Sequence, residues 1–115
     1  MPIDDLTGQF ISLTTYRRSG EEVPTTVWFA RADDFIIVPT GATTGKVKRL
    51  RNNPAVTMAR SNYRGKLKGD AVPGTARILE GADIDTARAV MKKKYGIQWR
   101  FTSNNTDTFL EITPT

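Results

Sequence analysis

The residues best suited to bind an anion lie between positions 40 and 46. This segment reads Thr40-Gly41-Ala42-Thr43-Thr44-Gly45-Lys46; it follows an apolar stretch and precedes a sequence that can form a short helix. Hydroxyl groups, backbone N–H groups at a helix start and a lysine together favour binding of a phosphate. The same residues also suit an ordinary strand-to-helix connection in which a threonine caps the helix. From the residues alone, both interpretations stay open.

The segment differs from the phosphate-binding loop of nucleoside triphosphatases. Gly41 and Gly45 are one residue closer together than that motif requires, and Val47 stands where a serine or threonine would bind magnesium. We therefore reject a nucleoside triphosphatase. Of the four cations over residues 46–51, Lys46 is nearest the predicted helix start and is the one expected to contact a phosphate. The other three would widen the positive field or form a solvated surface.

The composition narrows the chemistry that the chain can perform unaided. Its 115 residues include no cysteine and no histidine, which excludes disulfides, thiolate nucleophiles, serine–histidine dyads and nearly every usual zinc site. No metal site is predicted and no catalytic residue is assigned, although Tyr16, Tyr63 and Tyr95 could donate protons. An enzyme with this composition would rely on a bound cofactor. The net charge of +5 favours anionic partners, such as phosphorylated cofactors or nucleic acid.

A single mainly β domain over residues 1–115 is predicted to position these residues. Runs of β-branched and aromatic residues between polar turns predict six strands, over residues 10–16, 23–30, 35–38, 55–60, 74–79 and 108–113. The first three strands are expected to form a meander, with Pro24 marking an edge, a bulge or a cofactor-facing segment. Helical spacing predicts helices over 44–53 and 83–95. Six short strands with two helices favour a small antiparallel barrel over a sandwich.

Three further expectations concern single residues and the location of the protein. Trp28 is expected in the core, and the lysines at 92–94 are expected to complement the dipole of the second helix without forming a site. The first residues are acidic and no long apolar stretch follows them, so neither a signal peptide nor a membrane span is predicted. A cytoplasmic location is expected.

Several segments, in order along most of the chain, resemble one family of proteins. They are Leu13-Thr14-Thr15-Tyr16-Arg17-Arg18 followed by Gly20, Val23-Pro24-Thr25 with Val27-Trp28-Phe29, Thr40-Gly41-Ala42, Gly45 to Pro54, Arg64-Gly65, Gly74-Thr75-Ala76-Arg77 and Lys94-Tyr95-Gly96. The sequence resembles the pyridoxamine phosphate oxidase-like split barrels, and more closely the flavin/deazaflavin oxidoreductases of actinobacteria that are associated with the deazaflavin coenzyme F420. The resemblance implies a six-stranded antiparallel split β-barrel of the flavin mononucleotide-binding type. It also implies a homodimer with two cofactors in grooves between the subunits.

The resemblance also implies where the cofactor lies. In the oxidase relatives, a Ser-Arg-Lys segment at the start of the helix after the third strand holds the phosphate, and here those positions are Thr44, Gly45 and Lys46. Loss of the arginine removes a bidentate contact, which disfavours flavin mononucleotide and favours F420. The phosphate-binding residues are therefore expected to be Thr40, Gly41, Thr43, Thr44 and Lys46. The ring is expected against the main chain of Thr25, Thr26 and Val27, with Trp99 and Arg100 as contributions from the partner subunit.

The implied activity is hydride transfer between F420 and a small, conjugated organic acceptor. In such a reaction the protein mainly positions two flat molecules and excludes water. Two alternatives stay open. One is a flavin mononucleotide-dependent oxidoreductase of the same fold, and the other is a non-catalytic basic module that binds a cofactor or nucleic acid.

Overall fold

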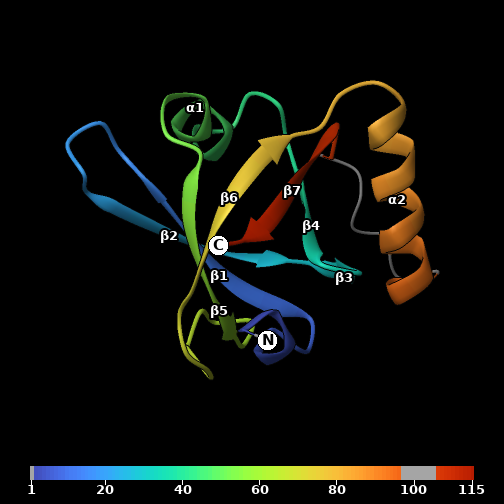
Figure 1. The fold of residues 1–115 in the computed structure, drawn as a ribbon, viewed down its shortest axis with the longest axis horizontal. Helices are drawn as coiled ribbons and strands as arrows, with labels where there is room; N and C mark the ends of the chain where they lie inside the picture. The colour runs from blue at the N-terminus through green and yellow to red at the C-terminus, as the bar shows by residue number, and fades with distance from the viewer. Residues whose placement is uncertain (1, 97–105) are drawn as a thin grey trace.

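The computed structural model describes residues 2–96 and 106–115, which form one curled antiparallel sheet flanked by helices (Figure 1). The strands are β1 (Phe10–Tyr16), β2 (Glu22–Trp28), β3 (Ala30–Ala32), β4 (Phe35–Thr40), β5 (Ala55–Ser61), β6 (Val72–Ile78) and β7 (Thr108–Pro114). The helices are the 3-10 helix η1 (Pro2–Asp5), α1 (Gly45–Asn52) and α2 (Ala82–Tyr95).

A single residue of the chain connects the two ends of the sheet. The strand order is β2-β1-β5-β6-β7-β4-β3, so β2 and β3 lie at opposite ends, yet only Phe29 separates them in the sequence. The sheet therefore curls until its ends approach each other, which gives a barrel that is split between them. The predicted split β-barrel is confirmed.

The predictions of six strands and of a meander are wrong. The stretch 23–30, expected as one strand, divides at Phe29 because its partner changes: Trp28 pairs with Phe10 of β1, whereas Ala30 pairs with Ile37 of β4. Phe29 and Ala30 are neighbours and both are only 1% exposed, which the alternation of side chains along one regular strand does not allow. The described part of the chain therefore has seven strands, and β2 does not pair with β3.

Alternation along the strands builds two apolar clusters. The larger fills the barrel and includes Leu13 of β1, Met58 of β5 and Leu50 of α1. The smaller lies on the outside of the sheet, where Met91 of α2 covers Phe109 of β7 and the residues around it. Figure 1 shows α2 alongside the strands β4, β7 and β3. The apolar faces expected of both helices are confirmed.

No helix among residues 2–96 and 106–115 is long and apolar enough to cross a membrane.

Candidate functional site

The turn between β4 and α1 is held together by the hydroxyl of Thr44. This hydroxyl donates to the carbonyl oxygen of Gly41 at 2.9 Å, accepts from the N–H of Val47 at 3.4 Å and lies 3.4 Å from the hydroxyl of Thr40. Thr44 therefore caps helix α1, which is one of the two roles considered for this segment. Thr40, Gly41 and Thr44 shape the turn, while Thr43 is exposed on it.

Asp107 occupies one side of the same turn. Its carboxylate accepts from the N–H of Ala42 at 2.6 Å, and its own N–H donates to the carbonyl oxygen of Thr40 at 3.3 Å. One of the N–H groups that a phosphate could use is thus already taken. The N–H groups of Gly45 and Lys46, at the start of α1, have no acceptor in the described ranges of the chain and stay available.

Two cations, Lys46 and Arg49, lie in the first two turns of α1. Lys46 is half-buried, and this burial, followed by the positive charge of Arg49, lowers the pKa of Lys46. The Nε of Arg49 donates to the hydroxyl of Thr15 in β1 at 2.7 Å. Within the described residues, no carboxylate forms an ion pair with either cation. The sequence pattern led only to Lys46 as a phosphate contact. Arg49 is three residues further along the helix, and residues at that spacing lie next to each other on a helix surface, so the pair could have been predicted.

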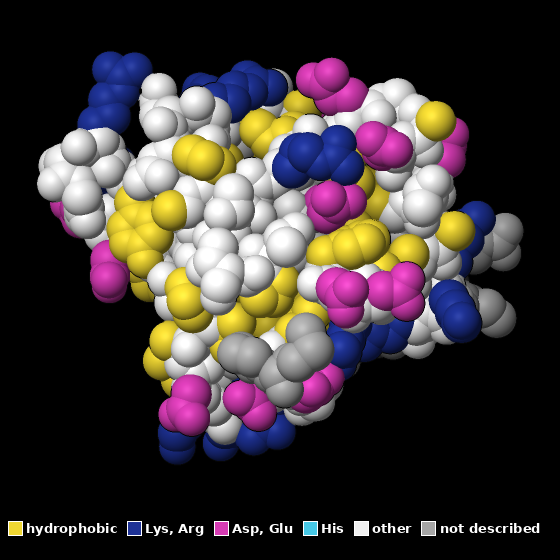
Figure 2. Space-filling model, viewed as in Figure 1, with side chains coloured by type: hydrophobic (Ala, Val, Ile, Leu, Met, Phe, Trp, Pro, Cys, Tyr) yellow, Lys and Arg dark blue, Asp and Glu magenta, His cyan; other side chains and the backbone are white. Residues whose placement is uncertain are grey.

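The exposed cations of α1 differ from this pair. Lys48 and Arg51 are exposed, so the helix is not one uniform cationic surface. On the face drawn in Figure 2, Lys and Arg side chains are spread around the molecule instead of being gathered in one patch. That distribution gives no continuous basic stripe, on this face, for a phosphodiester backbone.

The strand predicted to contact the ring lies next to this pair. Thr15, which anchors Arg49, is opposite Val23 of β2, and Thr25 lies two residues further along β2 on the same face. Thr26 points to the opposite face, whereas Thr25 and Val27 both face the same way as Thr15, which anchors the cation. Val27 is buried in the barrel core, so Thr25 is the less buried of these two. Because β2 ends the sheet, the main-chain groups along its outer edge have no strand partner among the described strands. The edge position expected for Pro24 is confirmed.

Two of the predicted site residues, Trp99 and Arg100, lie outside the described residues. Trp28 is partly buried, packs beside the cluster under α2, and has its ring centre 4.8 Å from that of Tyr95 and 6.0 Å from that of Phe10. Trp28 therefore lies at the margin of the core, and not within it as was expected.

The three tyrosines do not meet at the cation pair. The hydroxyl of Tyr16 lies 2.7 Å from that of Thr57 in β5, and the ring of Tyr63 is exposed. Burial raises the pKa of Tyr95 to about 12, partly opposed by the hydrogen bond that its hydroxyl donates to the carbonyl oxygen of Phe29. The hydroxyls of Tyr16 and Tyr95 are therefore engaged by other groups of the protein.

Lys94 has a structural role that the sequence analysis missed. Its Nζ donates to the carbonyl oxygens of Gly8 at 2.5 Å and Phe29 at 2.8 Å, and it lies 3.9 Å from the centre of the Phe29 ring. Burial lowers the pKa of Lys94 to about 8. These bonds hold the end of α2 against the residue that links the two ends of the sheet.

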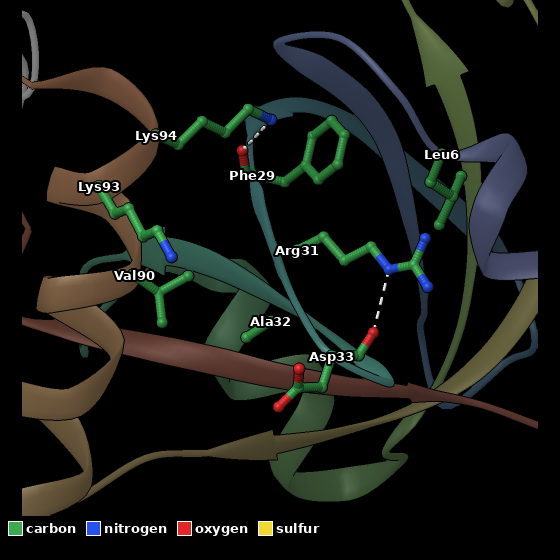
Figure 3. A pocket seen from close by; sticks show the side chains of 8 residues that line it. All are labelled: Leu6, Phe29, Arg31, Ala32, Asp33, Val90, Lys93 and Lys94. Carbon is green, nitrogen blue, oxygen red and sulfur yellow. Dashed lines mark hydrogen bonds between the residues drawn. The ribbon is translucent and has the colours of Figure 1, made fainter.

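A hollow of about 580 Å³ opens beside Lys94, between β3, η1 and α2 (Figure 3). Lys94 points across it to the Phe29 carbonyl, and Arg31 points towards the opposite wall. Arg31 already pairs with Asp4 at 2.5 Å and donates to the carbonyl oxygen of Asp33 at 3.0 Å. Most cations of this hollow therefore have protein partners, unlike Lys46 and Arg49.

A second hollow of about 350 Å³ lies on the outer face of β1, β2 and β5. Small and hydroxyl-bearing side chains line it, among them Ser12, Thr14 and Ala59. Leu67, at its margin, is 58% exposed. This face combines small side chains with an exposed apolar one.

No protein-family model and no curated protein matches the chain. Solved structures match it closely in fold. A protein of unknown function from Agrobacterium tumefaciens, Atu2129, has a TM-score of 0.74 at 16% identity over 93% of this chain. This chain spans only 48% of the length of Atu2129.

Two other matches have stated roles. HutZ, the heme storage protein of Vibrio cholerae, has a TM-score of 0.70 at 16% identity, covering 93% of this chain and 82% of HutZ. An F420-H2 dependent reductase, FDR-A, has a TM-score of 0.67 at 16% identity, covering 90% of this chain and 93% of the reductase. The chain has the split-barrel fold. At such identities the likeness establishes the fold alone, and function has to be argued from the site.

Proposed function

We propose that this protein is an oxidoreductase that binds the deazaflavin coenzyme F420 and transfers hydride between it and a small, conjugated organic acceptor. The observation that carries the proposal is the pair of cations at the start of α1, Lys46 and Arg49, which has no acidic partner in the described residues and lies one strand from β2, because Arg49 is anchored on β1. A phosphorylated cofactor supplies the missing negative charge. A reductase that uses the reduced form of F420 shares this fold, which supports the choice of cofactor.

The proposed site divides into two parts. The phosphate is held by Lys46, by the free N–H groups at the start of α1 and by the hydroxyl of Thr43, on a turn shaped by Thr40, Gly41 and Thr44. The ring lies along the main chain of Thr25, Thr26 and Val27. Trp99 and Arg100 remain proposed contacts from the partner subunit.

The chemistry then comes from the cofactor, because the chain has no histidine or cysteine. The reduced form of F420 would supply the hydride when bound, and the oxidised form would accept one in the reverse direction. The residues of the chain bind the phosphate, align the ring and exclude water from the reacting faces. The same composition disfavours a heme site, since histidine and cysteine are two of the usual axial ligands of heme iron.

Preference for F420 over flavin mononucleotide follows from the charges on α1. Gly45 brings no side chain to the phosphate, while the exposed Lys48 and Arg51 can meet the acidic glutamate tail that follows the phosphate of F420. We therefore expect the purified protein to be colourless, with F420 exchanged as a cosubstrate.

Separate fluorescence titrations with F420 and flavin mononucleotide test this preference. F420 should bind more tightly. A yellow protein with stoichiometric flavin mononucleotide, or tighter binding of flavin mononucleotide, contradicts the assignment. Binding of neither would favour a non-catalytic role.

We further propose a homodimer in which a second copy covers the outer face of β1, β2 and β5. Small and hydroxyl side chains allow two strand faces to approach closely, and Leu67 would lose its exposure to solvent. Covering this face would bring the partner close to β2 and hence to the proposed ring position.

A further inference from the structure

The guanidinium of Arg49 lies directly over Gly45. A Cβ atom on residue 45 would be 3.0 Å from the Nη1 atom of Arg49 and 3.8 Å from its Cζ atom. The φ angle of Gly45 is outside the left-handed region, so the backbone does not require glycine there. The space over residue 45 is tight, because a Cβ atom there would make the guanidinium shift by a few tenths of an ångström.

The position of Arg49 is fixed from the other side. Its Nε donates at 2.7 Å to Thr15, which is fully buried in the barrel wall. An arginine has five N–H donors, and this bond uses one of them. In the described part of the chain, the Nη1 and Nη2 groups of Arg49 have no acceptor. Two donors in a rigid fork are therefore held over the start of α1.

Lys46 adds a second positive charge near the start of α1. It is half-buried and, among the described residues, has neither a hydrogen-bond acceptor nor an acidic partner. Burial, and after it the like charge of Arg49, lowers the pKa of Lys46. A partly desolvated pair of like charges is costly unless an anion bridges it.

We propose that Arg49 binds the cofactor phosphate together with Lys46, and that the missing side chain at Gly45 is what admits the guanidinium to this position. The inference rests on the proposed function only for the identity of the cofactor, since the geometry selects any phosphate monoester or diester. Arg49 is then a determinant of phosphate affinity that acts from one turn further along α1. It would supply the bidentate contact that Gly45 does not provide.

Three variants test the proposal: Arg49→Gln, Gly45→Ala and the double variant. Arg49→Gln removes the donors, whereas Gly45→Ala leaves every charge in place and displaces only the guanidinium. We expect each single variant to weaken F420 binding about tenfold, as for loss of one charge-assisted contact. The double variant should be no weaker than Arg49→Gln, because both changes remove the same contact.

Lys93→Gln is the control, since it also removes one positive charge, from an exposed residue of α2 that has no part in the proposed cofactor site. It should change affinity by less than about twofold. Thermal unfolding shows that each variant is folded, and Gly45→Ala should not lower stability because alanine is the better helix former. Equal effects of Arg49→Gln and Lys93→Gln, or wild-type affinity in Gly45→Ala, would overturn the proposal.

A titration with inorganic phosphate separates this inference from the proposed function. The amide NMR signals of Gly45 and Lys46 should shift in the wild type, and Arg49→Gln should require about tenfold more phosphate for the same shift. Failure of F420 to bind, with this phosphate response intact, contradicts the proposed function and supports the role of Arg49. No phosphate response at residues 45 and 46 of the wild type contradicts the role of Arg49.

Discussion

Replacing Lys94 by methionine tests how α2 is fastened to the barrel. Methionine keeps most of the apolar stem but removes the ammonium that bonds to Gly8 and Phe29 at 2.5 and 2.8 Å. A hydrogen bond made by a charged group contributes about 1.5–3 kcal/mol, but one ammonium serves both carbonyls and the side chain is partly exposed. After this discount we expect Lys94→Met to lower the free energy of unfolding by about 1–2 kcal/mol.

Urea unfolding followed by circular dichroism measures this loss. Lys93→Met is the matched control, because Lys93 is the preceding residue, is exposed and forms no hydrogen bond with the described residues. It should change stability by less than about 0.5 kcal/mol. The urea dependence should be the same in all three proteins, since the fold buries the same surface. If the two variants unfold at the same urea concentration, the bonds of Lys94 contribute nothing and the reasoning fails.

The same variant makes a prediction about pH. Burial lowers the pKa of Lys94 to about 8 in the folded protein, against an ordinary value of 10.5. Between these two values the unfolded chain binds more protons than the folded protein, so the contribution of Lys94 to stability increases as pH rises. The difference in stability between wild type and Lys94→Met should therefore be constant below about pH 8 and widen from there to about pH 10.5. A difference that does not change with pH would show that Lys94 titrates normally.

Two further predictions concern the cofactor site and the assembly. Lys46→Ala should weaken F420 binding by about tenfold to a hundredfold without unfolding the protein, as measured by fluorescence titration. Lys93→Ala should have little effect. Equal effects would mean that F420 is attracted by the overall positive charge of the protein and not by a site at Lys46. Because the pKa of Lys46 is lowered, wild-type binding should also decline with rising pH before the ordinary lysine value of 10.5 is reached. Light scattering at micromolar concentration should give twice the chain mass of 12.8 kDa, and a monomer with normal cofactor affinity would exclude the shared groove.

Local patterns in the sequence predicted most of the elements but not their partners. Strand β1 was predicted with the bounds that the structure has, and α1 begins after its threonine cap and ends before Pro54, as its sequence indicates. The stretch from Val23 to Ala30 reads as one continuous strand because every part of it suits a strand. In the structure, this stretch leaves one end of the sheet at Trp28 and joins the other end at Ala30. The change of partner depends on how the whole sheet curls into a split barrel, so the local pattern of residues could not predict it.

The residues of the site show even more clearly that local sequence patterns do not reveal partners that are distant in the sequence. Lys46 could be found from its place after a turn rich in glycine and threonine, because that pattern is local. The partners of the other polar groups are distant in sequence: Arg49 bonds 34 residues away, Asp107 bonds 65 residues away and Lys94 bonds 86 residues away. Each of these contacts exists only after the barrel has brought two segments together, so no spacing rule could have indicated it.

The split in the barrel is what makes the proposed site possible. In a fully closed barrel, the outer edge of β2 would be paired with a neighbouring strand and its main chain would have no groups left for a ligand. Here the chain crosses from one end of the sheet to the other at Phe29, and the edge of β2 that faces away from β1 stays open, while Arg49 is anchored through Thr15 on the neighbouring strand β1. A ligand with a phosphate at one end and a flat polar ring at the other would place its phosphate at these cations and its ring along the unpaired main-chain groups of β2. Lys94 and Tyr95 fasten α2 to the carbonyl of Phe29, so the residue that creates the split is also the one that the end of α2 holds in place.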